Sequence, residues 1–174
     1  MDHNHQTRQK LTKQTVGGQA VLSRFFEEIL EEQPETVRTI ELTYFALTVT
    51  TIFYLQYGEQ DNKKALIDEV ITAVLRKETG RSATNPDLNI ETAHQEFKNR
   101  LSKYSALITQ LLQDDRDHNP IAELVIKFYE SATQKSAADK TFSTGKAGTV
   151  LSKYIIDNIK YVQREFRTPS PNQG

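Results

Sequence analysis

Hydrophobic residues recur at helical spacing along most of the chain, and one stretch departs from this pattern because it has no polar face. In residues 19–33 apolar side chains return every three or four positions, which predicts an amphipathic helix. Residues 42–58 (LTYFALTVTTIFYLQYG) instead contain no charged residue. A helix without a solvent face must be surrounded by other structure. We therefore expect a central buried helix over about 34–57, beginning at Pro34 and ending before Gly58.

Two helices are expected to follow the central one. The first covers about 61–78, with Gly80 in the C-terminal capping position. The second begins at Asn85-Pro86 or one turn later at Asn89, since both asparagines suit a helix cap. Its apolar positions alternate steps of four and three, which is typical of a helix packed nearly parallel or antiparallel to a neighbour. This expected seam consists of Ile90, His94, Phe97, Leu101, Tyr104, Ile108 and Leu111.

The last third of the chain is expected to hold two more helices and a long loop. Pro120 opens a short apolar helix. Ser131 to Thr149 is rich in small and polar residues and is expected to be a loop, with Thr149 as the cap of the next helix. The final helix covers about 149–166, where apolar residues form one stripe.

These elements predict an all-α fold of five to six helices around one central buried helix, about 34–57, in an orthogonal or bundle-like array. No stretch alternates apolar and polar residues as a strand would. The polar residues 1–18 are expected to form a flexible N-terminal arm and residues 168–174 a disordered tail. Residues 19–167 are then a single helical domain.

Composition narrows the classes of function. The 174 residues include 22 basic and 23 acidic side chains, interspersed along the chain, so no basic face for nucleic acid is expected. The absence of cysteine excludes disulfides and thiolate metal sites. Residues 42–58 contain four threonines and lack flanking basic clusters, so a buried core helix is favoured over stable membrane insertion. The N-terminus lacks the apolar core of a secretory signal, which favours a cytoplasmic location.

Two short motifs suggest chemistry but are incomplete. Glu91 and His94 have the Glu-x-x-His spacing of di-iron bundles, yet such a site needs a second copy and two more glutamates. We expect His94 to bond to a threonine or tyrosine on the seam instead, with no metal. Ser143 to Thr149 (STGKAGT) resembles part of a phosphate-binding loop but lacks its full pattern. No catalytic motif remains, so neither an enzyme nor a cofactor is expected.

The central helix is unusually rich in threonine and tyrosine, and this richness has two interpretations. In one, the threonine hydroxyls bond back to carbonyls one turn earlier and are satisfied within the core. In the other, polar side chains of this helix and of the helix near residue 100 line a small-ligand cavity. The candidate ligand-binding residues are Tyr44, Thr48, Thr51, Tyr54, His94 and Tyr104.

By elimination, the leading hypothesis is a non-enzymatic module that binds a protein partner or self-associates, for example as a homodimer. The aromatic residues Phe25, Phe26, Tyr154 and Tyr161 could lie at a partly exposed interface, although ordinary core packing is the favoured interpretation of each pair taken alone. The alternative is a small-ligand-binding regulatory domain with the tyrosine- and threonine-lined interior. A metal-binding bundle and a membrane-inserting protein rank lower.

Overall fold

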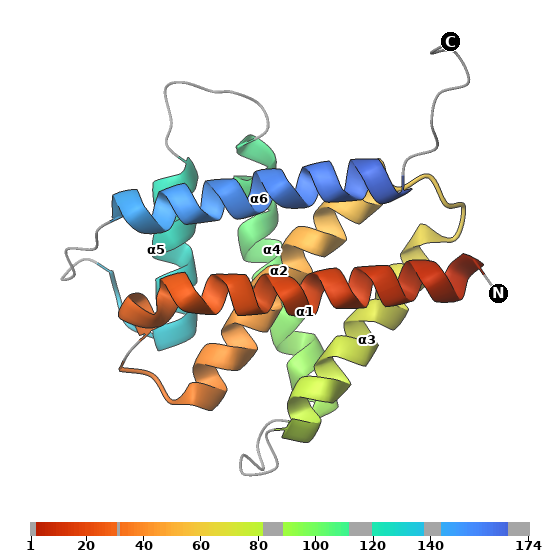
Figure 1. Ribbon diagram of the computed structural model, residues 1–174. Helices are drawn as coiled ribbons and strands as arrows, with labels where there is room; N and C mark the ends of the chain where they lie inside the picture. The colour runs from red at the N-terminus through yellow and green to blue at the C-terminus, as the bar shows by residue number, and fades with distance from the viewer. Residues whose placement is uncertain (1–2, 31, 82–88, 112–119, 138–143, 167–174) are drawn as a thin grey trace.

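The fold is all-α. The computed structural model of the chain describes residues 3–30, 32–81, 89–111, 120–137 and 144–166, and within these ranges it contains six helices and no strand (Figure 1). The helices are α1 (His3–Leu30), α2 (Glu35–Tyr57), α3 (Lys63–Arg81), α4 (Ile90–Gln110), α5 (Pro120–Thr133) and α6 (Thr144–Phe166). The expected tail at 168–174 lies outside the described residues.

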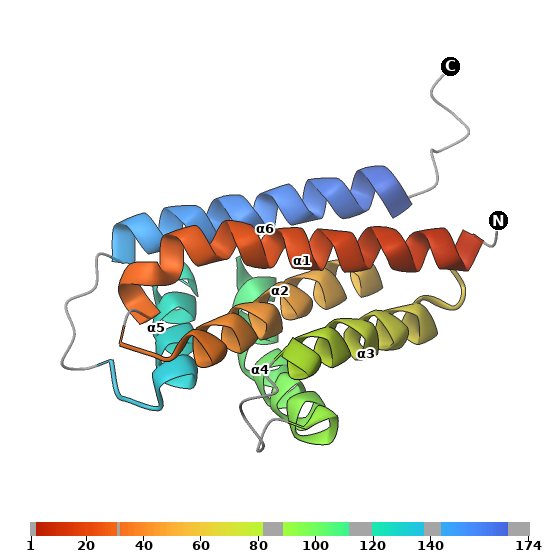
Figure 2. The same ribbon diagram turned by 60° about the horizontal axis from the view of Figure 1, so that its bottom comes forward.

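Helix α2 is the centre of the molecule, because every other helix packs against it. Helices α1 and α6 lie side by side and antiparallel across one side of α2, while α3, α4 and α5 lie behind them (Figures 1 and 2). The expectation of a central helix within an array of others is confirmed.

The composition of α2 explains its position. All residues from Ile40 to Thr51 are buried, which fits the absence of charge from Leu42 onward. Two threonines of this helix satisfy their hydroxyl groups locally. The Thr43 hydroxyl donates to the Thr39 carbonyl and the Thr48 hydroxyl donates to the Tyr44 carbonyl, each at 2.9 Å. The helix ends where expected, with the Gly58 backbone N–H donating to the Tyr54 carbonyl at 2.9 Å.

Helix α1 is longer than the sequence pattern indicated. The expected flexible arm over residues 1–18 is wrong for residues 3–18, which form the first half of α1. Thr7, Leu11 and Thr15 recur at spacing four and are buried, so this polar segment still presents one face to the core. The Thr15 hydroxyl reaches across to the Thr50 hydroxyl of α2 at 3.2 Å.

Contacts with α6 hold the outer side of α1 in place. Lys10 Nζ lies 2.9 Å from Glu165 Oε2, and Gln14 Nε2 donates to Asn158 Oδ1 at 3.3 Å. One turn further on, the Tyr154 hydroxyl packs directly over Gly18. These contacts set the antiparallel register of the two helices.

Other helix ends differ from expectation in detail. Gly80 lies within α3 rather than in a capping position after it. Asn89 caps α4, with its side chain accepting from the Thr92 N–H at 2.8 Å, while the alternative start at residues 85–86 lies outside the described residues. The expected loop over 131–149 is shorter, because α5 extends to Thr133 and α6 begins at Thr144.

Helix α4 packs on a stripe that partly matches the expected one, since Phe97, Tyr104 and Ile108 belong to both. Its buried residues are Ala93, Phe97, Arg100, Tyr104, Leu107 and Ile108. The steps of four and three are as predicted, but the stripe is rotated so that Arg100 is buried and Leu101 is only half-buried. In this orientation Arg100 meets an acidic partner, Glu41, inside the core.

Candidate functional site

A groove runs along one side of α1 and is called the α1 groove below. Its first half, about 510 Å³, lies between α1 and α3, and its second half, about 420 Å³, lies between α1 and the start of α2. Val16 lines both halves, which therefore adjoin. Figure 2 shows the three helices that form it, with α1 above the first turns of α2 and the length of α3.

The exposed surface inside the α1 groove is more apolar than polar, although uncharged polar side chains such as Thr12 and Gln19 also line it. Gly17, Ala20 and Ala73 are small, exposed residues on it, and Leu42 and Leu30 close its second half. Gly17 and Ala20 are on the side of α1 that faces away from Leu11 and Leu22, which are in the core.

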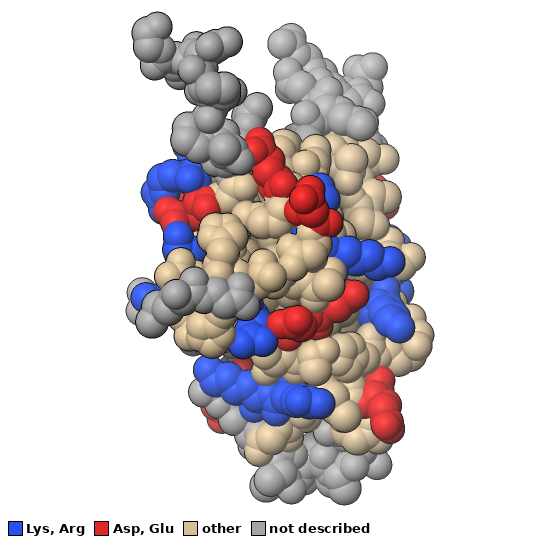
Figure 3. Space-filling model, turned by 90° about the vertical axis from the view of Figure 1, so that its right-hand side faces the viewer, with Lys and Arg blue, Asp and Glu red and all other residues tan. Residues whose placement is uncertain are grey.

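Basic side chains border this floor. Arg8, Lys13 and Lys77 line the first half and Arg38 the second, whereas Glu35 is the one acidic residue among the described residues that line either half. The face in Figure 3, seen from the right-hand side of Figure 1, is different, because basic and acidic residues are intermixed across it. The α1 groove thus combines apolar surface with an excess of positive charge.

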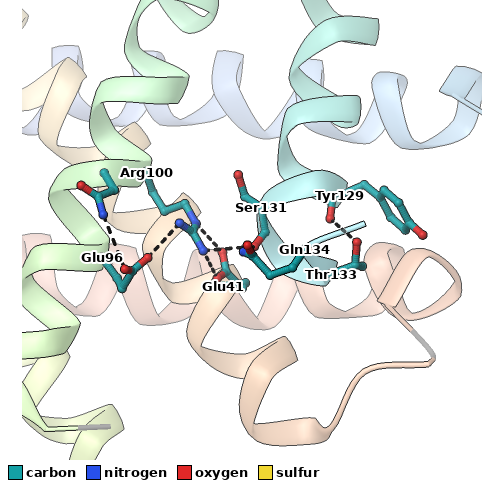
Figure 4. A network of polar contacts seen from close by, with 8 residues as sticks. Glu41, Glu96, Arg100, Tyr129, Ser131, Thr133 and Gln134 are labelled. Carbon is teal, nitrogen blue, oxygen red and sulfur yellow. Dashed lines mark hydrogen bonds and ion pairs between the residues drawn. The ribbon is translucent and has the colours of Figure 1, made fainter. Parts of the chain in front are cut away.

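A second polar feature lies in the core between α2, α4 and α5 (Figure 4). Arg100 of α4 forms a two-pronged ion pair with Glu41 of α2, with Nη2 2.6 Å from Oε1 and Nε 2.9 Å from Oε2. Both side chains are more than nine-tenths buried. The guanidinium also donates to Glu96 at 3.0 Å and to the Ser131 carbonyl of α5 at 3.1 Å.

The charges of this network depend on one another. Burial raises the pKa of the Glu41 carboxyl, and the hydrogen bonds and charge of Arg100 oppose this rise. Burial also disfavours the Arg100 charge, but the Glu41 carboxylate outweighs it and the pKa of Arg100 is raised. Removing either partner would leave the other charge buried without compensation.

Most hydrogen-bond donors of the Arg100 guanidinium have an acceptor, so the network connects helices structurally. Four of the five guanidinium N–H groups of Arg100 are used. Gln134 follows α5 directly and has a left-handed backbone conformation (φ 57°). Its Nε2 donates to the same Ser131 carbonyl at 2.7 Å. A polar surface pocket of about 610 Å³ adjoins Arg100 and includes Lys103 and Gln134. Arg100 therefore connects three helices beneath this pocket.

The structure places the six candidate ligand-binding residues in different parts of the molecule. Tyr44 and Tyr104 lie near the Glu41–Arg100 pair, whose charges affect the pKa of both phenols. Tyr54 is near the other end of α2, where its ring packs edge-on against Phe166 at 5.3 Å. None of these three lines either half of the α1 groove.

The remaining three candidates are also separate. Thr48 bonds within α2, and Thr51 is buried one turn further along. His94 is half-buried, with Nε2 3.5 Å from the Thr72 hydroxyl of α3. The expectation that His94 meets a threonine at a helix seam is confirmed, and the ligand cavity stays a prediction.

Several buried hydroxyl groups lack hydrogen-bond partners among the described residues. They belong to Tyr44, Thr51, Tyr54, Tyr104 and Tyr154. The Tyr104 hydroxyl lies beside Ser131 without meeting hydrogen-bond geometry. Burial raises the pKa of all four phenols, to about 12 for Tyr54.

The aromatic residues considered for an exposed interface are mostly in the core. Phe26 and Tyr154 are buried, and Phe26 packs edge-on against Phe128 with ring centroids 4.7 Å apart. Tyr161 is partly buried beside Phe166, and the Phe25 side chain lies outside the described part of the structure. Core packing, the interpretation that the sequence favoured, is confirmed for Phe26 and Tyr154, because both fill space between helices.

Sequence reasoning missed the residues that carry most of these features. Glu41 directly precedes the uncharged run, and the pattern of the sequence did not indicate that its side chain is buried. Arg100 lies at the step of three after Phe97, and this spacing was the signal that could have placed it on the buried stripe. The cations of the α1 groove come from three helices, and no periodicity within one helix relates them.

Other chemistry finds little support in the described residues. They contain no convergent group of three or more histidine, aspartate or glutamate side chains. Among the described helices, none combines the length and apolar character that crossing a membrane requires. Comparison of the chain with models of known families, with curated proteins and with solved structures gave no match.

Proposed function

We propose that this protein is a non-enzymatic interaction module that docks a helical segment of a partner protein in the α1 groove. The observation that carries this proposal is the groove itself, which exposes apolar surface between α1, α2 and α3 in two adjoining halves. Amphipathic helices bind such grooves through apolar residues spaced three and four apart. Self-association and a cytoplasmic location stay predictions.

The groove is accessible for mutation without disturbing the core. A Cβ atom at Gly17 would meet no other atom within 4 Å, so a leucine there extends into the groove. Gly80 of α3 has equally open surroundings and lies outside the groove, so it offers a control for the same substitution.

The test is a selection of displayed random helical peptides against the full chain. We expect enrichment of amphipathic sequences by the wild type and by Gly80→Leu, and its loss with Gly17→Leu. Equal enrichment by all three proteins would place binding elsewhere and contradict the proposal. Sedimentation of the protein alone, at rising concentration, tests whether a second copy is the occupant, since self-association makes the measured mass depend on concentration.

A second candidate function is small-ligand binding in the interior. It is supported by the buried hydroxyls of Tyr44 and Tyr104, which lie near the Glu41–Arg100 pair and have no partner among the described residues. An unsatisfied buried polar group carries a free-energy cost that a ligand would relieve. Native mass spectrometry of the protein purified from its own host tests this. A mass above the bare 19.9 kDa chain supports it, and the bare mass contradicts a tightly bound ligand.

A further inference from the structure

We infer that the segment docked in the α1 groove is an acidic amphipathic helix. This inference rests on the proposed function and adds the chemistry of the partner. Its basis is the charge of the groove, whose described lining residues include four cations and one acid in a chain with net charge −1. A docked helix that carried acidic residues beside its apolar face would match both the floor and the border of the groove.

Three of the four cations are available for a partner. Arg8 is already paired with Glu69 at 2.9 Å. Lys13, Arg38 and Lys77 form no ion pair with other described residues, and both lysines are exposed. The Nε atom of Arg38 is buried and has no acceptor among the described residues. A carboxylate brought by the partner would supply what the Arg38 guanidinium lacks.

The dimensions of the groove fit a helix of several turns. Its α1 edge extends from Arg8 to Leu30, which corresponds to about 33 Å at the helical rise. Lys13 and Lys77 lie in the first half and Arg38 in the second, so acidic residues are expected at both ends of the docked helix.

The apolar floor favours a protein over a nucleic acid. Nucleic-acid sites track a phosphate backbone with cations and use exposed aromatic rings for stacking. In the α1 groove the cations flank aliphatic residues, and Phe26, the one aromatic residue in the described lining, is only 1% exposed.

The experiment uses three synthetic helical peptides of about 20 residues with the same leucine face. Their flanking residues are glutamate, glutamine or lysine. Binding to the full chain is measured by chemical-shift changes in nuclear magnetic resonance spectra, which also detect weak complexes. We expect the glutamate peptide to bind roughly ten-fold more tightly than the glutamine peptide, since each exposed ion pair contributes modestly. The lysine peptide should bind most weakly, and added salt should reduce the differences.

Charge reversal provides the matched control. The double variant Lys13→Glu/Lys77→Glu should bind the lysine peptide more tightly than the glutamate peptide. Lys98→Glu/Lys160→Glu makes the same charge change at exposed lysines outside the groove and should keep the original order. Retention of the original order by the groove variant would overturn the inference.

The remaining outcomes separate this inference from the proposed function. If all three peptides bind equally and Gly17→Leu alone abolishes binding, docking stands and the acidic preference is wrong. If none of the peptides binds, both are wrong. Tighter binding of a random-sequence DNA duplex than of the glutamate peptide, abolished by Lys13→Glu/Lys77→Glu, would overturn the assignment to a protein segment.

Discussion

Arg100 of α4 donates two hydrogen bonds to Glu41 of α2 inside the core, although 59 positions separate the two residues in the chain. The pair fixes how α4 is rotated against the central helix. Because the same guanidinium donates to the Ser131 carbonyl, it also holds the end of α5.

We predict that Arg100→Met lowers the free energy of unfolding by about 3–5 kcal/mol, because it leaves Glu41 buried without a counter-charge. Glu41→Leu/Arg100→Met should recover most of this loss, since no charge then remains buried. Urea unfolding measures both. Lys103→Met, at an exposed neighbour, should change stability by less than about 0.5 kcal/mol. A cost for Arg100→Met as small as that of the control would contradict a stabilising role of the pair.

The adjacent glycines of α1 should respond in opposite directions to alanine. Gly17→Ala should stabilise the protein by about 1 kcal/mol, because alanine is the better helix former and the site is open. Gly18→Ala should destabilise it by about 1–2 kcal/mol, because the new Cβ would overlap the Tyr154 hydroxyl. Thermal or urea unfolding of both variants decides this. Equal effects would mean that α6 does not pack over Gly18 as described.

Stability should fall at alkaline pH through the buried phenols. Burial raises the pKa of Tyr54 from 10.0 to about 12. Because the folded-state pKa of Tyr54 is raised, the stability that its neutral phenol contributes is complete below the unfolded-state pKa. This stability is lost as the pH rises from 10 toward 12. Circular dichroism should show unfolding in this window, together with tyrosinate absorbance. Tyr54→Phe should reduce the loss, and ordinary ionisation of Tyr54 in the folded protein would contradict it.

The contact between Lys10 and Glu165 should be visible in a titration. The hydrogen bond from Lys10 lowers the pKa of Glu165, with a further contribution from Arg164. Because the folded-state pKa of Glu165 is lowered, its carboxylate stabilises the folded protein at pH values above the ordinary pKa of 4.5. This stabilisation is lost as the pH falls through the folded-state pKa. Because the pair is exposed, this contribution is small and salt-screened.

Lys10→Gln should therefore raise the pKa of Glu165 toward its ordinary value, as followed by nuclear magnetic resonance. Lys98→Gln, on α4, should leave that pKa unchanged. An unchanged Glu165 pKa in Lys10→Gln would mean that the first turns of α1 do not lie against the end of α6.

Much of the fold could be read from local signals. The run after Glu41 predicted a buried central helix, and Pro34 and Gly58 marked its ends because proline and glycine act on their own stretch of backbone. The first half of α1 was missed because its buried face consists partly of threonine, as at Thr7 and Thr15. A hydropathy pattern does not distinguish a threonine that will be buried from one that will be exposed.

The candidate site was far less predictable. Of the six candidate ligand-binding residues, Tyr44 and Tyr104 lie near one polar network, and the other four lie elsewhere. Lys13, Arg38 and Lys77 were ordinary surface cations in the sequence. They border one groove only because α1, α2 and α3 meet at particular angles.

The sequence by itself determined most of the helical segments, apart from the first half of α1, and that α2 lies inside, because periodicity, caps and the absence of charge are properties of neighbouring residues. The tertiary structure alone decided that Arg100 is buried against Glu41 and that an apolar groove with unpaired cations follows α1. Those features depend on the rotation and crossing of packed helices, and a repeat of three and four fits several rotations. The buried charge pair selects one of them, since the alternative would leave Glu41 in the core without a partner.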